Sequence, residues 1–220
     1  MRISAIATAT LVVLAMTPSI AQPRGSFVEV DENLWVTFYD VPSHRFRSIR
    51  DAFVRRDFDA VRRDLVTSAS HLTIESGRSS PELADRLADV GQQMLQMSDN
   101  LDGPEVTAEL LDKLFGRTHW LLAQHYLYHA RISRDANNNS MAGRYLWATT
   151  HHMERAALWS DSRISRKLVN SLEELRDLAV QLQDRQLAAA ARQEKPVARA
   201  EAVLQEIGRQ IDRPVVLKIK

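Results

Sequence analysis

The chain has 220 residues, with 29 basic and 28 acidic side chains and a formal net charge of +1. This near-equal number of positive and negative charges argues against nucleic acid as a main partner, because phosphate backbones select strongly basic surfaces. The sequence contains no cysteine, which excludes disulfide bonds, a cysteine-linked lipid anchor and thiolate metal sites.

Residues 1–21 have the pattern of a cleavable secretory signal peptide. Arg2 gives a positive start, an apolar run follows, and Pro18 interrupts that run. Ser19 and Ala21 place small residues at the two positions that a signal peptidase reads, so we expect cleavage after Ala21. The alternative is an uncleaved membrane anchor, but the run is shorter than the roughly 20 residues that a spanning helix needs, and Pro18 lies within it. The pattern predicts a periplasmic or secreted protein with no stable membrane span after cleavage.

The next segment, residues 22–42, differs from the rest of the chain. Its apolar residues alternate with others, which predicts a short β-hairpin or an extended arm. They are Val28, Val30, Leu34, Val36 and Phe38.

From residue 43 onward, glycine and proline are sparse and apolar residues follow a helical period, which predicts long helices. The expected helices cover residues 44–55, 58–76, 81–100, 104–134, 141–159, 163–191 and 201–208. The final residues 215–220, VVLKIK, predict a short strand that could pair with the N-terminal arm.

The helices also show an internal duplication. Arg56-Asp57 recurs as Arg134-Asp135, 78 residues later, and after this turn the spacing becomes 81 residues. The matching pairs there are Arg63 with Arg144, Leu65 with Leu146, His71 with His152, and Leu72 with Met153. Third helices match as Leu83 with Ile164, Leu87 with Leu168, Met94 with Leu175, Met97 with Leu178, and Leu101 with Leu182. We interpret this as two copies of a three-helix unit, which bury apolar faces against each other.

The sequence therefore predicts an all-α fold in which duplicated three-helix units form a helical bundle. A short extended or β arm precedes the bundle, and a second could follow it. The expected parts are a signal peptide (1–21), an arm (22–42), a first repeat unit (43–102), a second repeat unit (103–192) and a tail with a short helix and strand (193–220).

The segment from Arg50 to Leu65, RDAFVRRDFDAVRRDL, resembles the repeated hairpin of YfdX-like periplasmic helical proteins. That family has a signal peptide and duplicated helical hairpins. The resemblance implies a stress-related or chaperone-like role in the cell envelope, and it assigns no functional residue.

Five of the seven histidines lie in the second repeat unit, which makes them candidate metal ligands. His125 and His129 share a helix face, and His151 and Glu154 have HxxE spacing. This spacing is similar to the GxHxxE motif of imelysin-like envelope proteins, with Thr149 where that motif has glycine. The candidate metal ligands are His125, His129, His152 and Glu154. The alternative is that these histidines are hydrogen-bonded core residues.

No GxSxG, HExxH, P-loop or GxGxxG motif occurs, and no spacing suggests a catalytic triad. We therefore expect an exported, non-catalytic helical protein that binds a protein or a small ligand, with no required cofactor. The alternative is a bundle that binds a divalent metal or cofactor through histidines of the second repeat, and hydrolase activity is a third interpretation. The sequence leaves open whether the chain forms a homo-oligomer.

Overall fold

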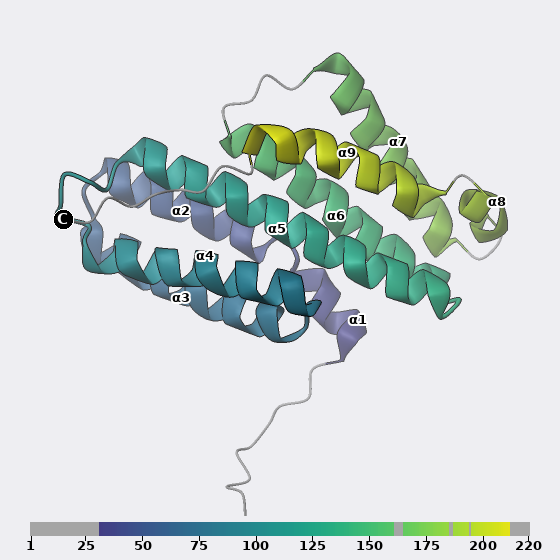
Figure 1. The fold of residues 1–220 in the computed structure, drawn as a ribbon, viewed down its shortest axis with the longest axis horizontal. Coiled ribbons are helices and arrows are strands. Elements are labelled where there is room, and N and C mark those ends of the chain that lie inside the picture. The colour runs from purple at the N-terminus through teal and green to yellow at the C-terminus, as the bar shows by residue number, and fades with distance from the viewer. Residues whose placement is uncertain (1–30, 161–164, 185–186, 194, 212–220) are drawn as a thin grey trace, which may run out of the picture. The chain divides into compact units, whose positions relative to one another are not determined.

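A computed structural model describes residues 31–160, 165–184, 187–193 and 195–211 of the chain (Figure 1). The expected signal peptide, the first part of the arm (22–30) and the expected C-terminal strand lie outside these residues. The described part contains helices and no strand, which confirms the all-α class. Its elements are α1 (Glu32–Trp35), the 3-10 helix η1 (Val36–Phe38), α2 (Val41–Val54), α3 (Phe58–Gly77), α4 (Pro81–Asp99), α5 (Ala108–Asp135), α6 (Asn139–Trp159), α7 (Arg166–Gln183), α8 (Ala188–Gln193) and α9 (Pro196–Ile211).

Two helical hairpins, α2–α3 and α5–α6, have the same turn. Arg56 and Asn137 have positive φ angles of 60° and 59°, which reverse the chain in the left-handed region. The next residues, Asp57 and Asn138, are N-caps whose side chains accept from the backbone N–H three residues on. These features recur 81 residues apart, and so do the ends of α2 and α5 at Val54 and Asp135. The expected equivalence of Arg56-Asp57 with Arg134-Asp135 is therefore wrong, because the second pair still belongs to α5.

The third helices, α4 and α7, match at a different spacing from the expected one. Their N-caps, Ser80 and Ser165, are 85 residues apart. At this spacing, buried residues fall on buried residues. The pairs are Leu83 with Leu168, Leu87 with Leu172, Val90 with Leu175, Met94 with Ala179, and Met97 with Leu182. The structure thus repeats a three-helix pattern, with the third helix of the second copy displaced along the sequence.

The expected β-hairpin or extended arm over residues 22–42 is not seen in its described part, which is helical from Glu32 to Phe38; residues 22–30 lie outside the described residues. Asp31 caps α1 by accepting from the backbone N–H of Asn33. Val36 is 2 % exposed in η1, where it packs into the core. A helical turn buries Val36 against other helices, and that tertiary gain overrides the alternating pattern.

The longest helix, α5, lies at the centre of the bundle. It packs against α2, α4, α6 and α9, and the run Thr118–Ala123 is buried without a break. A helix that is buried around its circumference is a core helix. Figure 1 shows α9 lying across α5 and α6. Helix α5 begins at Ala108, later than the expected residue 104, because a turn precedes it and Thr107 is its N-cap.

The expected helix 163–191 is divided. Its first part, α7, ends at Gln183, and Asp184 has an extended backbone. The expected helix at 201–208 forms the middle of α9, which begins at Pro196.

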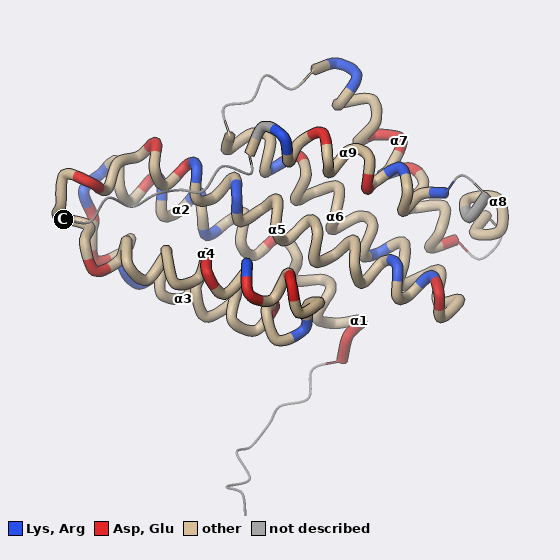
Figure 2. Tube along the Cα trace, in the orientation of Figure 1, with Lys and Arg blue, Asp and Glu red and all other residues tan. Residues whose placement is uncertain are grey.

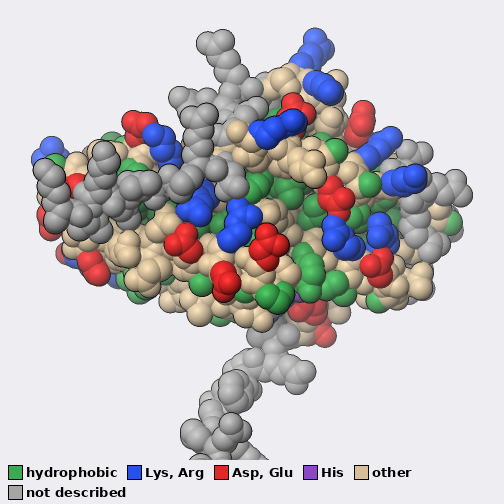
Figure 3. All heavy atoms as spheres, in the orientation of Figure 1, with side chains coloured by type: hydrophobic (Ala, Val, Ile, Leu, Met, Phe, Trp, Pro, Cys, Tyr) green, Lys and Arg blue, Asp and Glu red, His purple; other side chains and the backbone are tan. Residues whose placement is uncertain are grey.

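Charges of both signs are interspersed along the helices, as Figure 2 shows. On the face seen in Figure 3, acidic and basic side chains alternate, with hydrophobic side chains between them. No helix in the described part of the chain is long and apolar enough to cross a membrane.

Candidate functional site

Six of the seven histidines come together inside the bundle. With Glu75 they form what we call the histidine cluster: His71 and Glu75 from α3, His119, His125 and His129 from α5, and His151 and His152 from α6. The rings of His125 and His129 are 4.6 Å apart, and those of His119 and His152 are 5.1 Å apart, centre to centre. Tyr126 joins the two groups by contacting His125 and His152.

Among the described residues, Glu75 supplies the carboxylate at the centre of this cluster, and its side chain is fully buried. One oxygen, Oε2, lies 2.8 Å from His125 Nε2 and 2.8 Å from Arg78 Nη1. The other oxygen, Oε1, accepts from Trp35 Nε1 at 3.0 Å and lies 3.6 Å from His71 Nε2. A buried carboxylate needs such partners, because its desolvation costs several kcal/mol.

These partners keep Glu75 ionised. Burial alone would raise the pKa of its carboxyl group. The hydrogen bond and charge of His125, together with the charges of Arg78 and His71, outweigh burial and lower that pKa to about 2. The charge of Glu75 in turn raises the pKa of the buried Tyr126 hydroxyl, in the same direction as burial.

His119 and His152 form a second buried pair with no carboxylate. Their Nδ1 atoms are 2.8 Å apart, so one ring donates to the other. Both Nε2 atoms are buried and have no hydrogen-bond partner among the described residues. Burial, followed by neighbouring positive charge, holds the pKa of each ring well below 6.5. Burial likewise lowers the pKa of His129 to about 4. The rings of His119 and His152 are therefore neutral at pH 7.

The N-terminal arm completes the cluster. Besides the Trp35 bond to Glu75, the carboxylate of Glu32 accepts from Arg78 and from the Tyr145 hydroxyl. His151 Nε2 lies 2.8 Å from Ser43 Oγ and 2.9 Å from Asp40 Oδ1, which ties α6 to the start of α2. The described part of the arm, residues 31–42, therefore packs over the histidine cluster.

The structure gives the four predicted metal ligands separate partners. His125 contacts Glu75 and Ser79, while His129 Nε2 lies 3.1 Å from the Arg78 carbonyl oxygen. Glu154 instead pairs with Arg176 of α7 at 2.7 Å. No group of three or more His, Asp or Glu side chains in the described residues is arranged to hold a metal ion. The metal site at His125, His129, His152 and Glu154 stays a prediction.

The cluster reaches the surface at an apolar pocket between α2 and α3. This pocket encloses about 240 Å³. Its apolar walls are Val41, Pro42, Phe46, Leu72 and Ile74, and its polar groups are Arg45, Thr67, Ser68, Ser70 and His71. The ring of His71 stacks on Trp35, with the ring centres 6.2 Å apart. A ligand in the pocket would thus touch the histidine cluster through His71, while Glu75 itself stays buried.

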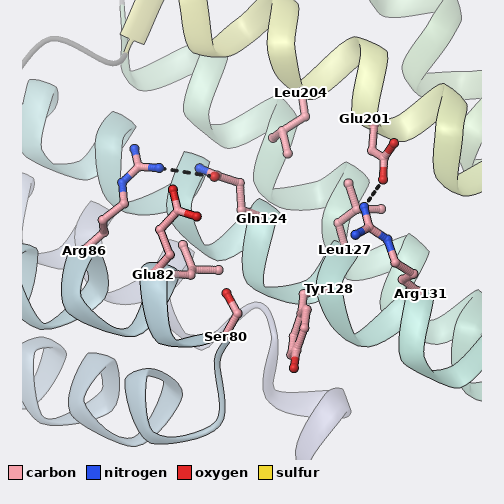
Figure 4. A pocket seen from close by; sticks show the side chains of 10 residues that line it. Ser80, Glu82, Arg86, Gln124, Leu127, Tyr128, Arg131, Glu201 and Leu204 are labelled. Carbon is pink, nitrogen blue, oxygen red and sulfur yellow. Dashed lines mark hydrogen bonds and ion pairs between the residues drawn. The ribbon is translucent and has the colours of Figure 1, made fainter.

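A second pocket, of about 250 Å³, lies between α4, α5 and α9 (Figure 4). Both of its arginines, and Glu201, contact other protein groups. Arg86 Nη1 donates to Gln124 at 3.4 Å and its guanidinium lies over the Trp120 ring, while Arg131 pairs with Glu201. The Arg86 contacts join α4 to α5 and the Arg131–Glu201 pair joins α5 to α9, which gives the second pocket a structural role.

Sequence reasoning missed Glu75, Trp35 and Arg78 as members of the site. One signal was available for Glu75, because it continues the apolar stripe of α3 through Leu65 and Leu72. A charged residue on such a stripe is rarely buried without partners. The contacts of Trp35 and Arg78 had no local signal in the sequence.

Comparisons of the chain with protein-family models, curated proteins and solved structures found no match.

Proposed function

We propose that this chain is an exported, non-catalytic helical protein of the bacterial cell envelope that binds a small ligand in the pocket between α2 and α3. The signal-like residues 1–21 and the absence of cysteine support the envelope location. The resemblance to YfdX-like proteins agrees with that location. The pocket carries the binding proposal.

The pocket has the character of a ligand site. Binding sites for small molecules are concave and mostly apolar, with a few polar groups that fix the ligand's orientation. Here the apolar walls from Val41 to Ile74 surround Arg45 and His71. An engineered apolar cavity of about 150 Å³ holds benzene, so a pocket of about 240 Å³ has room for a ligand of about ten non-hydrogen atoms.

The chemistry of the cluster favours binding over catalysis. The ionised carboxylate of Glu75 is fully buried and faces Trp35, His125 and Arg78. A catalytic base has to come within hydrogen-bond reach of the substrate. His71 is the cluster member that reaches the pocket, and the other histidines stabilise its surroundings.

Filling the pocket should abolish binding. Thr67 is exposed on α3 and lines the pocket, so Thr67→Trp places an indole in the space a ligand needs. We expect isothermal titration with phenylacetate or phenylacetamide to detect binding to the wild-type protein and at least about tenfold weaker binding to the variant.

Thr73→Trp is the matched control. Thr73 is also exposed on α3 and, like Thr67, donates its hydroxyl to the carbonyl four residues before it, but it does not line the pocket. The control should bind as the wild type does. Equal binding by the wild type and Thr67→Trp would contradict the proposed site.

Export can be tested independently of binding. Expressed in a Gram-negative bacterium, the full chain should appear in the periplasm with Gln22 as its first residue, because cleavage is expected after Ala21. The same chain without residues 2–21 should stay in the cytoplasm. Mass spectrometry of the intact protein measures the cleavage, and a full-length product in the membrane fraction would instead support an uncleaved anchor.

A further inference from the structure

We propose that the ligand of the α2–α3 pocket is a small monoanion with an apolar body, such as a short aromatic or branched aliphatic carboxylate, held by Arg45. This inference rests on the proposed function and names the chemical class of the ligand. It follows from the hydrogen-bond donors and the charges around the pocket.

The hydroxyl groups of the pocket have already donated their hydrogens. Thr67, Ser68 and Ser70 each donate to a main-chain carbonyl of α3, at distances of 2.7, 2.7 and 3.0 Å. Each hydroxyl has only one hydrogen, so these groups offer a ligand only lone pairs. Among the described side chains that line the pocket, the donors that remain are the guanidinium of Arg45 and the ring of His71.

Arg45 is weakly engaged in this structure. Its Nη1 lies 3.9 Å from Asp64 Oδ1, whereas Arg50, also in α2, has its Nε 2.8 Å from Asp112 Oδ1 of α5. Asp64 also accepts from Ser48 at 3.2 Å. An arginine forms its strong, often bidentate contacts with carboxylates at about 2.7–2.9 Å. The guanidinium therefore retains donors that a bound carboxylate could use.

The remaining charges around the pocket do not oppose an anion. Val41 and Pro42, at the first turn of α2, line the pocket, and the positive end of a helix dipole favours negative charge. Asp40, which precedes them, is paired with His44 at 2.8 Å and His151 at 2.9 Å. Behind His71, the carboxylate of Glu75 is buried and contacts His125 and Arg78.

The apolar walls require the rest of the ligand to be hydrophobic. Ile74 is 49 % exposed and, together with the half-buried Val41, forms part of the pocket surface, where neither side chain offers a hydrogen bond. A fully polar anion of the same size would leave these walls wet. A ligand with one carboxylate at Arg45 and an apolar body against Val41 and Ile74 matches both parts of the pocket.

The test compares acids with amides of the same shape by isothermal titration at pH 7. The pairs are phenylacetate with phenylacetamide and 4-methylpentanoate with 4-methylpentanamide. We expect each acid to bind the wild-type protein about tenfold or more tightly than its amide, because charge-assisted hydrogen bonds are the stronger ones. Arg45→Gln should reduce this preference to less than about twofold and leave binding of the amide unchanged.

Two further variants separate the contribution of Arg45 to ligand binding from that of other charged residues. Arg47→Gln removes a guanidinium that contacts His44 and the Ser43 carbonyl outside the pocket, and it should keep the full preference. Asp64→Asn frees Arg45 and should tighten binding of the acids. Equal binding of acid and amide to the wild-type protein would overturn the inference and leave the proposed function standing. Failure of all four compounds to bind would count against both.

Discussion

Replacing Glu75 with glutamine should lower the free energy of unfolding by about 3–5 kcal/mol. The substitution keeps the shape of the side chain and removes the charge that pairs with His125 and Arg78 at 2.8 Å each. The fully buried His125 then lacks its anion, while Arg78 retains only Glu32. Removing one partner of a buried ionic network is among the most costly defects in a protein. Urea unfolding followed by circular dichroism measures the change.

Glu109→Gln is the control for this experiment. Glu109 also pairs with a basic residue, Lys113, but its side chain is 78 % exposed. Surface substitutions of this kind change stability by less than about 0.5 kcal/mol. A Glu75→Gln variant with the wild-type urea midpoint would show that the Glu75 network contributes little to the fold.

The second large effect is a loss of stability in mild acid. Burial holds the pKa of His119 and His152 well below 6.5 in the folded protein and that of His129 at about 4, whereas the unfolded chain titrates near 6.5. Between these values the unfolded state binds more protons. Stability should therefore be full above about pH 6.5 and decrease toward pH 4, by about 1.4 kcal/mol per pH unit for each such histidine.

Glu75 adds a separate loss at lower pH. Its pKa of about 2 lies below the unfolded value of 4.5, so its contribution is complete above pH 4.5 and disappears as the pH falls toward 2. Urea midpoints at pH 7.5, 6, 5 and 4 measure the histidine range. Equal midpoints at pH 7.5 and 5 would contradict the assignment of neutral, buried histidines.

Two variants test whether the buried pair His119 and His152 causes the pH dependence of stability. His119→Leu combined with His152→Leu replaces both partners of one hydrogen bond with apolar groups, which is often nearly neutral at pH 7. This double variant should lose a large part of the pH dependence. His44→Gln should keep it, because the His44 side chain is 70 % exposed.

The sequence predicted the scaffold well and the site only in part. The helical periods and the turn at Arg56 located α2 to α6, because periodicity and capping act within a few residues. The repeat pairing of His71 with His152 holds in the 81-residue spacing of the hairpins, and both residues belong to the histidine cluster. The predicted 78-residue register before the turn is wrong, because a positive-φ residue followed by an N-cap defines the turn, and the Arg-Asp dipeptide does not.

What the sequence by itself determined is the helical class, the positions of most helix ends and the duplication. Each of these depends on local spacing of apolar residues and on caps such as Asp57 and Asn138. Only the tertiary structure decided that the segment from Glu32 to Phe38 is helical, that six histidines meet, and that Glu75 lies among them. These features depend on contacts between residues distant in the sequence, such as Glu75 with His125 and Trp35. No local sequence pattern encodes these contacts. Burial by them sets the protonation of the cluster, and the packing of α2 on α3 places the pocket beside it.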